Sequence, residues 1–324
     1  MDMCMKIIIF IRSTSSLQHR LFRQLLEETE ADYKDLLLHN DVRWLSKGKA
    51  LDRFWSLREE IVIFLGNCTQ RNAEKYRKVL NDNAFLADVC FLNDLFAHLN
   101  TLNFKLQGRD KTIIDLVEQL NAFRDKLPLF LMDLQTAKLL HFPNLKDFIA
   151  LKTDSATVTN GMIELLQNLH KNFNDRFEDF NIPKNVLLFV RDPFKIPPAS
   201  DFSSNAKKLL SSVDEGSLQL ELVDIQCSSV LKEDFQECGT IKFWSERIQK
   251  EQFPNARKVA IFMLAMFGST YTCESSFSHM NAIKTDNSSP LSNDRLQDCM
   301  RIALTSYNPN FIKVAQKRKC NFSH

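Results

Sequence analysis

Few side chains in this sequence combine the residue types and spacings that catalysis or metal binding requires. The eight cysteines form no Cys-x-x-Cys pair, and zinc-finger spacing is missing. The signatures of serine hydrolases, P-loop proteins and zinc proteases are missing as well. The remaining candidates fall in two segments: one, at 267–302, holds a single glutamate, Glu274, and the other, at 39–61, centres on Arg43 and Trp44.

These two segments resemble two sequence blocks of hAT-superfamily DNA transposases and of the host proteins derived from them. Residues 267–302 are similar to the C-terminal block, in which a Ser-rich turn leads into a helix. Residues 39–61 are similar to the Arg-Trp block. Weaker likeness at 102–127, 177–194 and 316–324 extends the resemblance over nearly the whole chain.

The resemblance implies a metal-binding role for Glu274, but not in this chain alone. The matching glutamate of the family is the last acidic residue of a site with two aspartates, whose carboxylates hold two metal ions for strand transfer. The two aspartates, the RNase-H-like strands that carry them and the zinc-binding BED finger have no match in this chain. Because one carboxylate cannot hold two metal ions, we expect no catalytic residue, no metal, no cofactor and no enzymatic activity.

The resemblance also marks Arg43 and Trp44 as candidates for DNA contact. In active relatives an aromatic residue of the inserted helical domain stacks on a flipped base, an interaction worth about 1–3 kcal/mol. The alternative is that Trp44 is a core residue beside an ion-paired arginine. Weak DNA binding is expected at most, since the net charge is only +2 and positions that are basic in relatives read Asp286, Ser288 and Pro290.

Hydrophobic periodicity predicts a mainly α-helical fold. The chain has 324 residues, 44% of them hydrophobic and only seven of them glycine, and apolar residues recur three and four positions apart. No stretch alternates at period two for long, so the body is predicted to be all α. The apolar segment near the start is expected to be buried, with helix and strand both open, and it is too short to span a membrane.

The sequence predicts two regions. Residues 1–235 are expected to form an all-α domain like the family's insertion domain. Residues 236–324 are expected to form the C-terminal dimerisation region, made of the last helices of an incomplete RNase-H-like fold. The Pro-rich segment at 182–204 is predicted to be a surface linker or an ordered loop, because it cannot continue a helix. Pro254 is expected to restart the chain before a further apolar run.

The apolar faces of the C-terminal region predict self-association. Helices that normally cover a sheet leave those faces exposed without it, and exposed apolar faces favour a partner. The alternative is that they form the core of a domain. The residues expected at a dimer interface are Phe243, Trp244, Phe267, Phe277 and Leu296.

We therefore expect a non-catalytic, transposase-derived interaction protein that forms a homodimer in the nucleus. A short basic tail with Lys313 and residues 317–319 is a candidate import signal, although solvated termini often have this composition. Two further hypotheses stay open, namely a DNA-binding module that uses Arg43 and Trp44, and an α-helical scaffold for another protein. Neither a membrane nor a small-molecule substrate is indicated.

Overall fold

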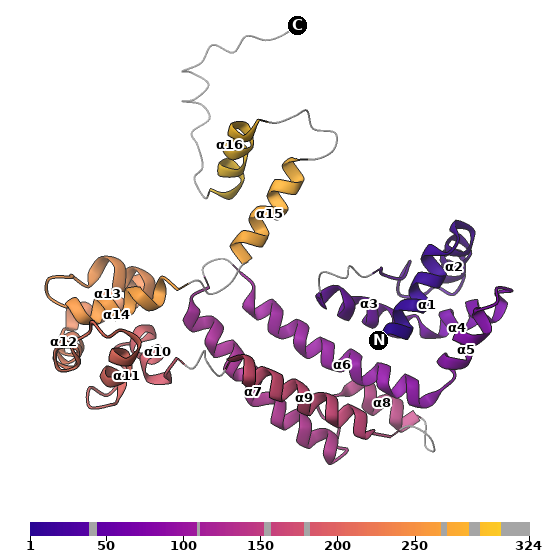
Figure 1. The fold of residues 1–324 in the computed structure, drawn as a ribbon, viewed down its shortest axis with the longest axis horizontal. Coiled ribbons are helices and arrows are strands. Elements are labelled where there is room, and N and C mark those ends of the chain that lie inside the picture. Colours follow the sequence, from indigo (N-terminus) through magenta and orange to yellow (C-terminus); the bar gives the residue numbers. More distant parts are fainter. Residues whose placement is uncertain are drawn as a thin grey trace, which may run out of the picture.

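The computed structural model describes residues 1–38, 44–108, 111–151, 157–177, 182–266, 271–284 and 292–305, with backbone only at 44–45 and 271–275. Every regular element in these ranges is helical, with sixteen α-helices, one π-helix and no strand (Figure 1). The prediction of a mainly α-helical fold is confirmed.

The first core lies between helices of the N-terminal part of the chain. They are α1 (Asp2–Ser13), α2 (Ser16–Glu28), α3 (Trp44–Ser56), α4 (Arg58–Asn67), α5 (Ala73–Leu80) and the start of α6 (Asn83–Leu106). The apolar segment for which the sequence favours neither helix nor strand forms α1, where Ile7, Ile8 and Ile11 share a buried face. The rings of Phe10 and Tyr76 meet edge to face at 5.1 Å between centroids and join α1 to α5.

The second core lies between α6 and the three helices that follow it. These are α7 (Ile113–Gln135), α8 (Pro143–Leu151) and α9 (Asn160–Phe177). The long helix α6 belongs to both cores, since Val89 packs in the first while Cys90 and Phe91 pack in the second. At the start of α9 the Thr159 hydroxyl accepts the N–H of Met162 at 3.3 Å and caps the helix.

The third core contains the segment that the sequence predicts to be a linker. Its helices are α10 (Lys184–Arg191), α11 (Phe202–Leu209), α12 (Glu215–Cys227), α13 (Ser229–Lys242), the π-helix η1 (Phe243–Arg247) and α14 (Pro254–Leu264). The surface-linker prediction is wrong because α10 fits between Pro183 and Pro193 and buries Val186 and Phe189. Both prolines flank the helix, where no N–H of the helical ladder is lost. Pro254 begins α14, as expected.

The last described helices, α15 (Tyr271–Ile283) and α16 (Asn293–Leu304), pack against each other. In Figure 1 they stand apart from the three cores. No side chain that the structure describes in this pair is buried. The expected division at 235/236 stays a prediction, and we note that residue 235 falls inside α13, in a core with members on both sides of it.

Candidate interaction surface

Phe243 and Trp244 lie in the core of the chain, although the sequence predicts them at a dimer interface. Both side chains are fully buried, and the indole N–H of Trp244 donates to the carbonyl of Val190 at 2.7 Å. The ring of Phe189 packs against that indole at 5.2 Å between centroids. Gly239, at φ +72°, allows the sharp break in α13 that turns this segment inward. In this arrangement neither ring can touch a second copy, which favours the core alternative for these two residues.

The start of α14 is held by a carboxylate from another helix. Glu221 of α12 is buried and accepts the N–H of Ala256 at 2.7 Å, the N–H of Asn255 at 3.2 Å and the side-chain amide of Asn255 at 2.8 Å. These N–H groups belong to the first turn, which has no acceptor within its own helix. The preceding residue, Phe253, makes no side-chain cap. Glu221 therefore fixes the position of α14 against α12.

A buried carboxylate from another helix also caps the start of α8 in the second core. Asp94 of α6 accepts the N–H of Leu145 at 3.1 Å, the N–H of Asn144 at 3.3 Å and the side-chain amide of Asn144 at 2.6 Å. Both helices begin with the sequence Phe-Pro-Asn. Burial raises the pKa of Asp94 above its ordinary value, and the hydrogen bonds from Leu145 and Asn144 offset only part of that rise.

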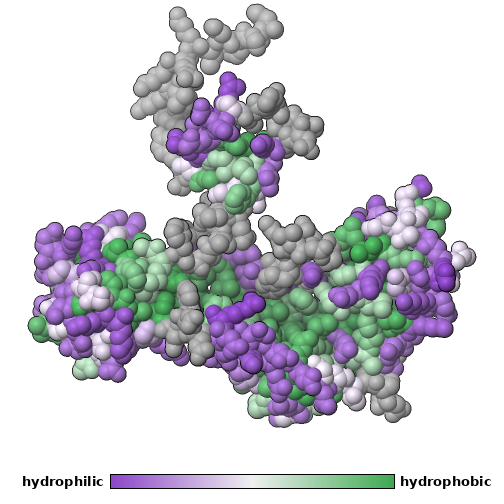
Figure 2. Space-filling view, in the orientation of Figure 1, coloured by the Kyte–Doolittle hydropathy of each residue, from purple (hydrophilic) through white to green (hydrophobic). Residues whose placement is uncertain are grey.

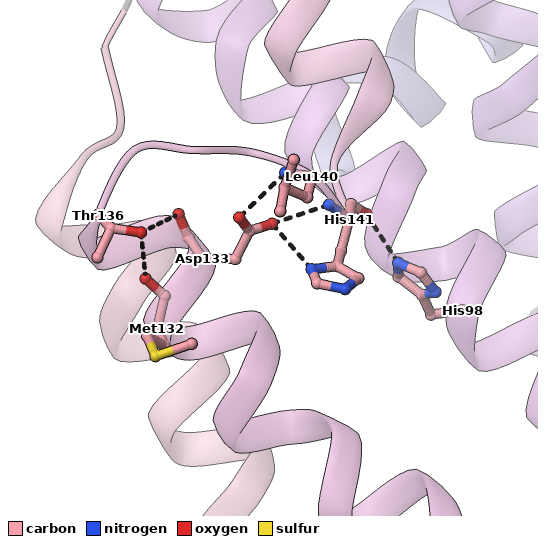
Figure 3. Close-up of polar contacts among 6 residues, drawn as sticks. All are labelled: His98, Met132, Asp133, Thr136, Leu140 and His141. Carbon is pink, nitrogen blue, oxygen red and sulfur yellow. Dashed lines mark hydrogen bonds and ion pairs between the residues drawn. The ribbon is translucent and has the colours of Figure 1, made fainter.

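A third buried carboxylate, Asp133, organises the connection between α7 and α8 (Figure 3). It accepts the N–H of Leu140 at 3.0 Å, the N–H of His141 at 2.8 Å and the ring nitrogen Nδ1 of His141 at 3.0 Å. His98 of α6 in turn contacts the carbonyl of His141 through Nε2 at 2.8 Å. Burial favours the neutral acid here too, but the donors on His141 and Leu140 outweigh it and hold the pKa of Asp133 below its ordinary value.

Each of these three carboxylates accepts hydrogen bonds from the fold itself, and these bonds compensate for its burial. Across the residues that the structure describes, no group of three or more His, Cys, Asp or Glu side chains is placed to hold a metal ion. Within the same ranges, no helix is long and apolar enough to cross a membrane.

The Arg-Trp block is only partly placed. Arg43 lies outside the described residues, and Trp44 is the first residue of α3 but its side chain is not described. Gly48 lies where α3 packs against α6, since a Cβ there would approach the Asn100 amide nitrogen to 2.6 Å. The glycine of this block therefore has a packing role, and the DNA-contact role of Arg43 and Trp44 stays a prediction.

The C-terminal candidates divide in a similar way. Phe267 and the basic tail lie outside the described residues, and Glu274 lies in α15 with its side chain outside them. Phe277 on α15 is 61% exposed, and Ile302 on α16, which the sequence analysis does not single out, is 75% exposed. Leu296 is half-buried.

The pair α15 and α16 exposes an apolar surface that no other described part of the chain covers. Half-buried apolar residues occur on both helices: Met280, Ile283, Leu296, Cys299, Met300 and Leu304. Figure 2 shows hydrophobic residues on these helices among hydrophilic neighbours. The Ser292 hydroxyl accepts the N–H of Arg295 at 3.4 Å and caps the start of α16. We call this pair the terminal hairpin.

Comparison with known protein families gives two matches, one in the N-terminal part of the chain and one in the C-terminal part. Residues 1–135 match the FAM200/GTF2IRD2 helical domain, and residues 224–304 match the hAT family C-terminal dimerisation region. The first match ends where α7 ends, and the second begins within α12 and ends with α16.

Two curated relatives carry the same name, General transcription factor II-I repeat domain-containing protein 2. The Bos taurus protein is 31% identical over 287 residues, which make up 89% of this chain and 28% of the relative. The Mus musculus protein is 30% identical over 270 residues, or 83% of this chain and 26% of the relative. The chain thus spans about a quarter of the length of these relatives. No solved structure gives a significant match.

The resemblance seen in the sequence is thereby confirmed. The chain carries a helical domain of the FAM200/GTF2IRD2 type ahead of a hAT C-terminal dimerisation region, and over most of its length it is related to the two curated proteins above.

Proposed function

We propose that this chain is a non-catalytic interaction protein that forms a homodimer through the terminal hairpin and acts in the nucleus. One observation carries the proposal. Within the matched dimerisation region, η1 and α14 bury apolar side chains in the third core and α13 packs partly buried ones against it, whereas the terminal hairpin has no buried side chain among those described.

The spacing of the apolar residues on α16 supports this surface. Leu296, Cys299, Met300 and Leu304 occupy positions i, i+3, i+4 and i+8 and therefore form one stripe of the helix. Such a stripe normally faces a core, and two short helices alone cannot bury it. A second copy that presents the same stripe across a two-fold axis would cover both.

The other parts of the proposal have separate support. Glu274 is one carboxylate where the family's chemistry needs three, which favours a non-catalytic role. The curated relatives are named as containing general transcription factor II-I repeats, and transcription is nuclear, which favours the nucleus.

The oligomeric state of the purified chain tests the proposal. We expect size-exclusion chromatography with light scattering to give a dimer that dissociates on dilution. Phe277→Ser and Ile302→Ser are each expected to weaken the dimer by about 30-fold, the effect of losing a central apolar contact worth about 2 kcal/mol. The matched control is Phe104→Ser, since Phe104 lies on α6 and is 80% exposed.

A wild-type chain that stays monomeric at high concentration would contradict the homodimer. The hypothesis of an α-helical scaffold for another protein would then be favoured. A dimer that neither hairpin variant weakens would contradict the proposed surface. Salt-sensitive DNA binding that is lost in Trp44→Ala would instead support the DNA-binding hypothesis.

A further inference from the structure

A cavity between α1 and α5 is lined by polar side chains whose hydrogen-bonding groups have no partner among the described residues. Its volume is about 520 Å³, and it is far from the terminal hairpin in sequence. The polar side chains that line it come from α1, from the α4–α5 connection and from α5: Lys6, Thr14, Gln70, Arg71, Asn72 and Tyr76.

None of these six side chains forms a hydrogen bond or ion pair with another described residue. Some other cationic side chains of the same part of the chain do have partners. Arg12 pairs with Asp35 at 3.3 Å, and Arg53 donates to the carbonyl of Asp35 at 2.9 Å. The donors around the cavity therefore keep their full capacity for a ligand.

The charge around the cavity has one sign. Lys6 and Arg71 are both exposed and line it, whereas no carboxylate does. The acidic residue nearest in sequence on α5, Glu74, is held by Arg77 at 3.0 Å. A guanidinium, an ammonium, two amides and two hydroxyls without a carboxylate match an anion with several acceptor oxygens.

The two helices that carry these groups pack together beneath the cavity. Phe10 on α1 and Tyr76 on α5 meet edge to face at 5.1 Å, and both rings also line the cavity. Ile9, which is 47% exposed, adds an apolar wall. A ligand that fits would have a charged group for the cations and an apolar neighbour for Ile9.

We propose that this cavity binds a phosphomonoester carried on a peptide, such as a phosphorylated serine or threonine in a partner protein. A phosphomonoester has a charge of about −1.5 to −2 at neutral pH and three acceptor oxygens, which the two cations that line the cavity can match. A nucleic-acid strand spreads single charges along its length and is held by a longer row of cations. Lys6 and Arg71, with Ile9 as an apolar wall, fit the first ligand better.

Fluorescence anisotropy on the full chain tests this proposal. The probes are a degenerate pool of short labelled peptides with a central phosphoserine, the same pool with serine, and a single-stranded oligonucleotide. The phosphoserine pool is expected to bind at least about tenfold more tightly than the serine pool, and inorganic phosphate is expected to compete. Arg71→Gln and Lys6→Gln are each expected to weaken that binding about tenfold, the effect of one charge-assisted hydrogen bond.

The matched control is Lys78→Gln, an equal change of charge on α5 outside the cavity, which is expected to leave binding within about twofold. Equal binding of the two peptide pools would overturn the proposal, and so would phosphopeptide binding that neither cavity variant weakens. If the oligonucleotide binds more tightly than the phosphoserine pool and loses affinity in the same variants, the cavity is a nucleic-acid contact instead.

Discussion

The matched dimerisation region has two halves whose apolar residues end in opposite environments. In the first half, Phe243 and Trp244 are fully buried against α10 and α14. In the second half, Phe277 and Ile302 are largely exposed on helices with no buried side chain among those described. The two halves differ in what precedes them, because α10 to α12 supply a core for the first and no described helix does so for the second. The apolar residues of the first half thus stabilise the fold of the chain. Those of the terminal hairpin are exposed to a partner.

The largest effect on folding is expected from Trp244→Ala. The substitution removes a fully buried ring and leaves the carbonyl of Val190 without its donor. We expect the free energy of unfolding to fall by about 3–5 kcal/mol, measured by urea denaturation at a concentration where the chain is monomeric. Trp244→Phe is expected to cost less, since it keeps most of the packing. A change below about 1 kcal/mol for Trp244→Ala would contradict the burial of the first half.

A smaller effect is expected from Glu221→Ala, which uncaps α14. The N–H groups of Asn255 and Ala256 lose their acceptor, so we expect a loss of about 2 kcal/mol in the free energy of unfolding. Glu233→Ala, on the exposed side of α13, is the control and is expected to cost less than about 0.5 kcal/mol. Equal effects of the two substitutions would mean that α14 does not depend on α12 for its start.

Two buried carboxylates, Asp133 and Asp94, are expected to make the stability of the chain depend on pH. The pKa of Asp133 is lowered in the folded chain, so its contribution is present above the unfolded pKa of about 3.9 and is lost as pH falls below that value. The pKa of Asp94 is raised, so its carboxyl favours the folded state at low pH and that advantage is lost as pH rises above about 3.9.

Urea denaturation between pH 3 and 7 separates the two groups, with each proton contributing a slope of at most about 1.4 kcal/mol per pH unit. Asp133→Asn is expected to flatten the profile on the acid side. Asp94→Asn is expected to change the slope in the opposite sense at higher pH. If the free energy of unfolding of both variants changes with pH as that of the wild-type chain does, the assigned pKa directions are wrong.

The smallest effect on folding is expected from Phe277→Ser, although it is expected to weaken the dimer strongly. Because the ring is exposed within the chain, the free energy of unfolding of the monomer should change by less than about 0.5 kcal/mol. A loss of 2 kcal/mol or more in the monomer would show that the hairpin contributes to the fold of its own chain, and the contrast between the two halves would disappear.

Much of the fold follows from local patterns in the sequence. Three- and four-residue periodicity predicts the helices, and Pro254 and the polar residues before α9 mark helix starts. The segment 182–204 shows where this reasoning stops. Its four prolines were sufficient to predict a break, but the nine residues between Pro183 and Pro193 contain a partly buried helix of eight residues. Proline content reports where a helix cannot continue and not whether a short helix fits between two prolines.

The candidate residues at the interface were harder to predict, for a different reason. Periodicity shows that Phe243, Trp244 and Phe277 each need an apolar environment, but it does not say whether the same chain supplies it. The partner of Trp244 is Val190, 54 residues away, and no local pattern connects them. One signal was present and unused, since the repeated Phe-Pro-Asn sequence marks the two helix starts that buried carboxylates hold.

These two helix starts also constrain the order in which the chain folds. Neither Phe142 nor Phe253, just before the prolines, offers a side-chain acceptor to the first turn. The acceptors come from Asp94 and Glu221, separated from the asparagines by 50 and 34 residues. Loops of that length must close before either cap exists. The first turns of α8 and α14 are therefore completed late, only in molecules whose α6 or α12 has already docked.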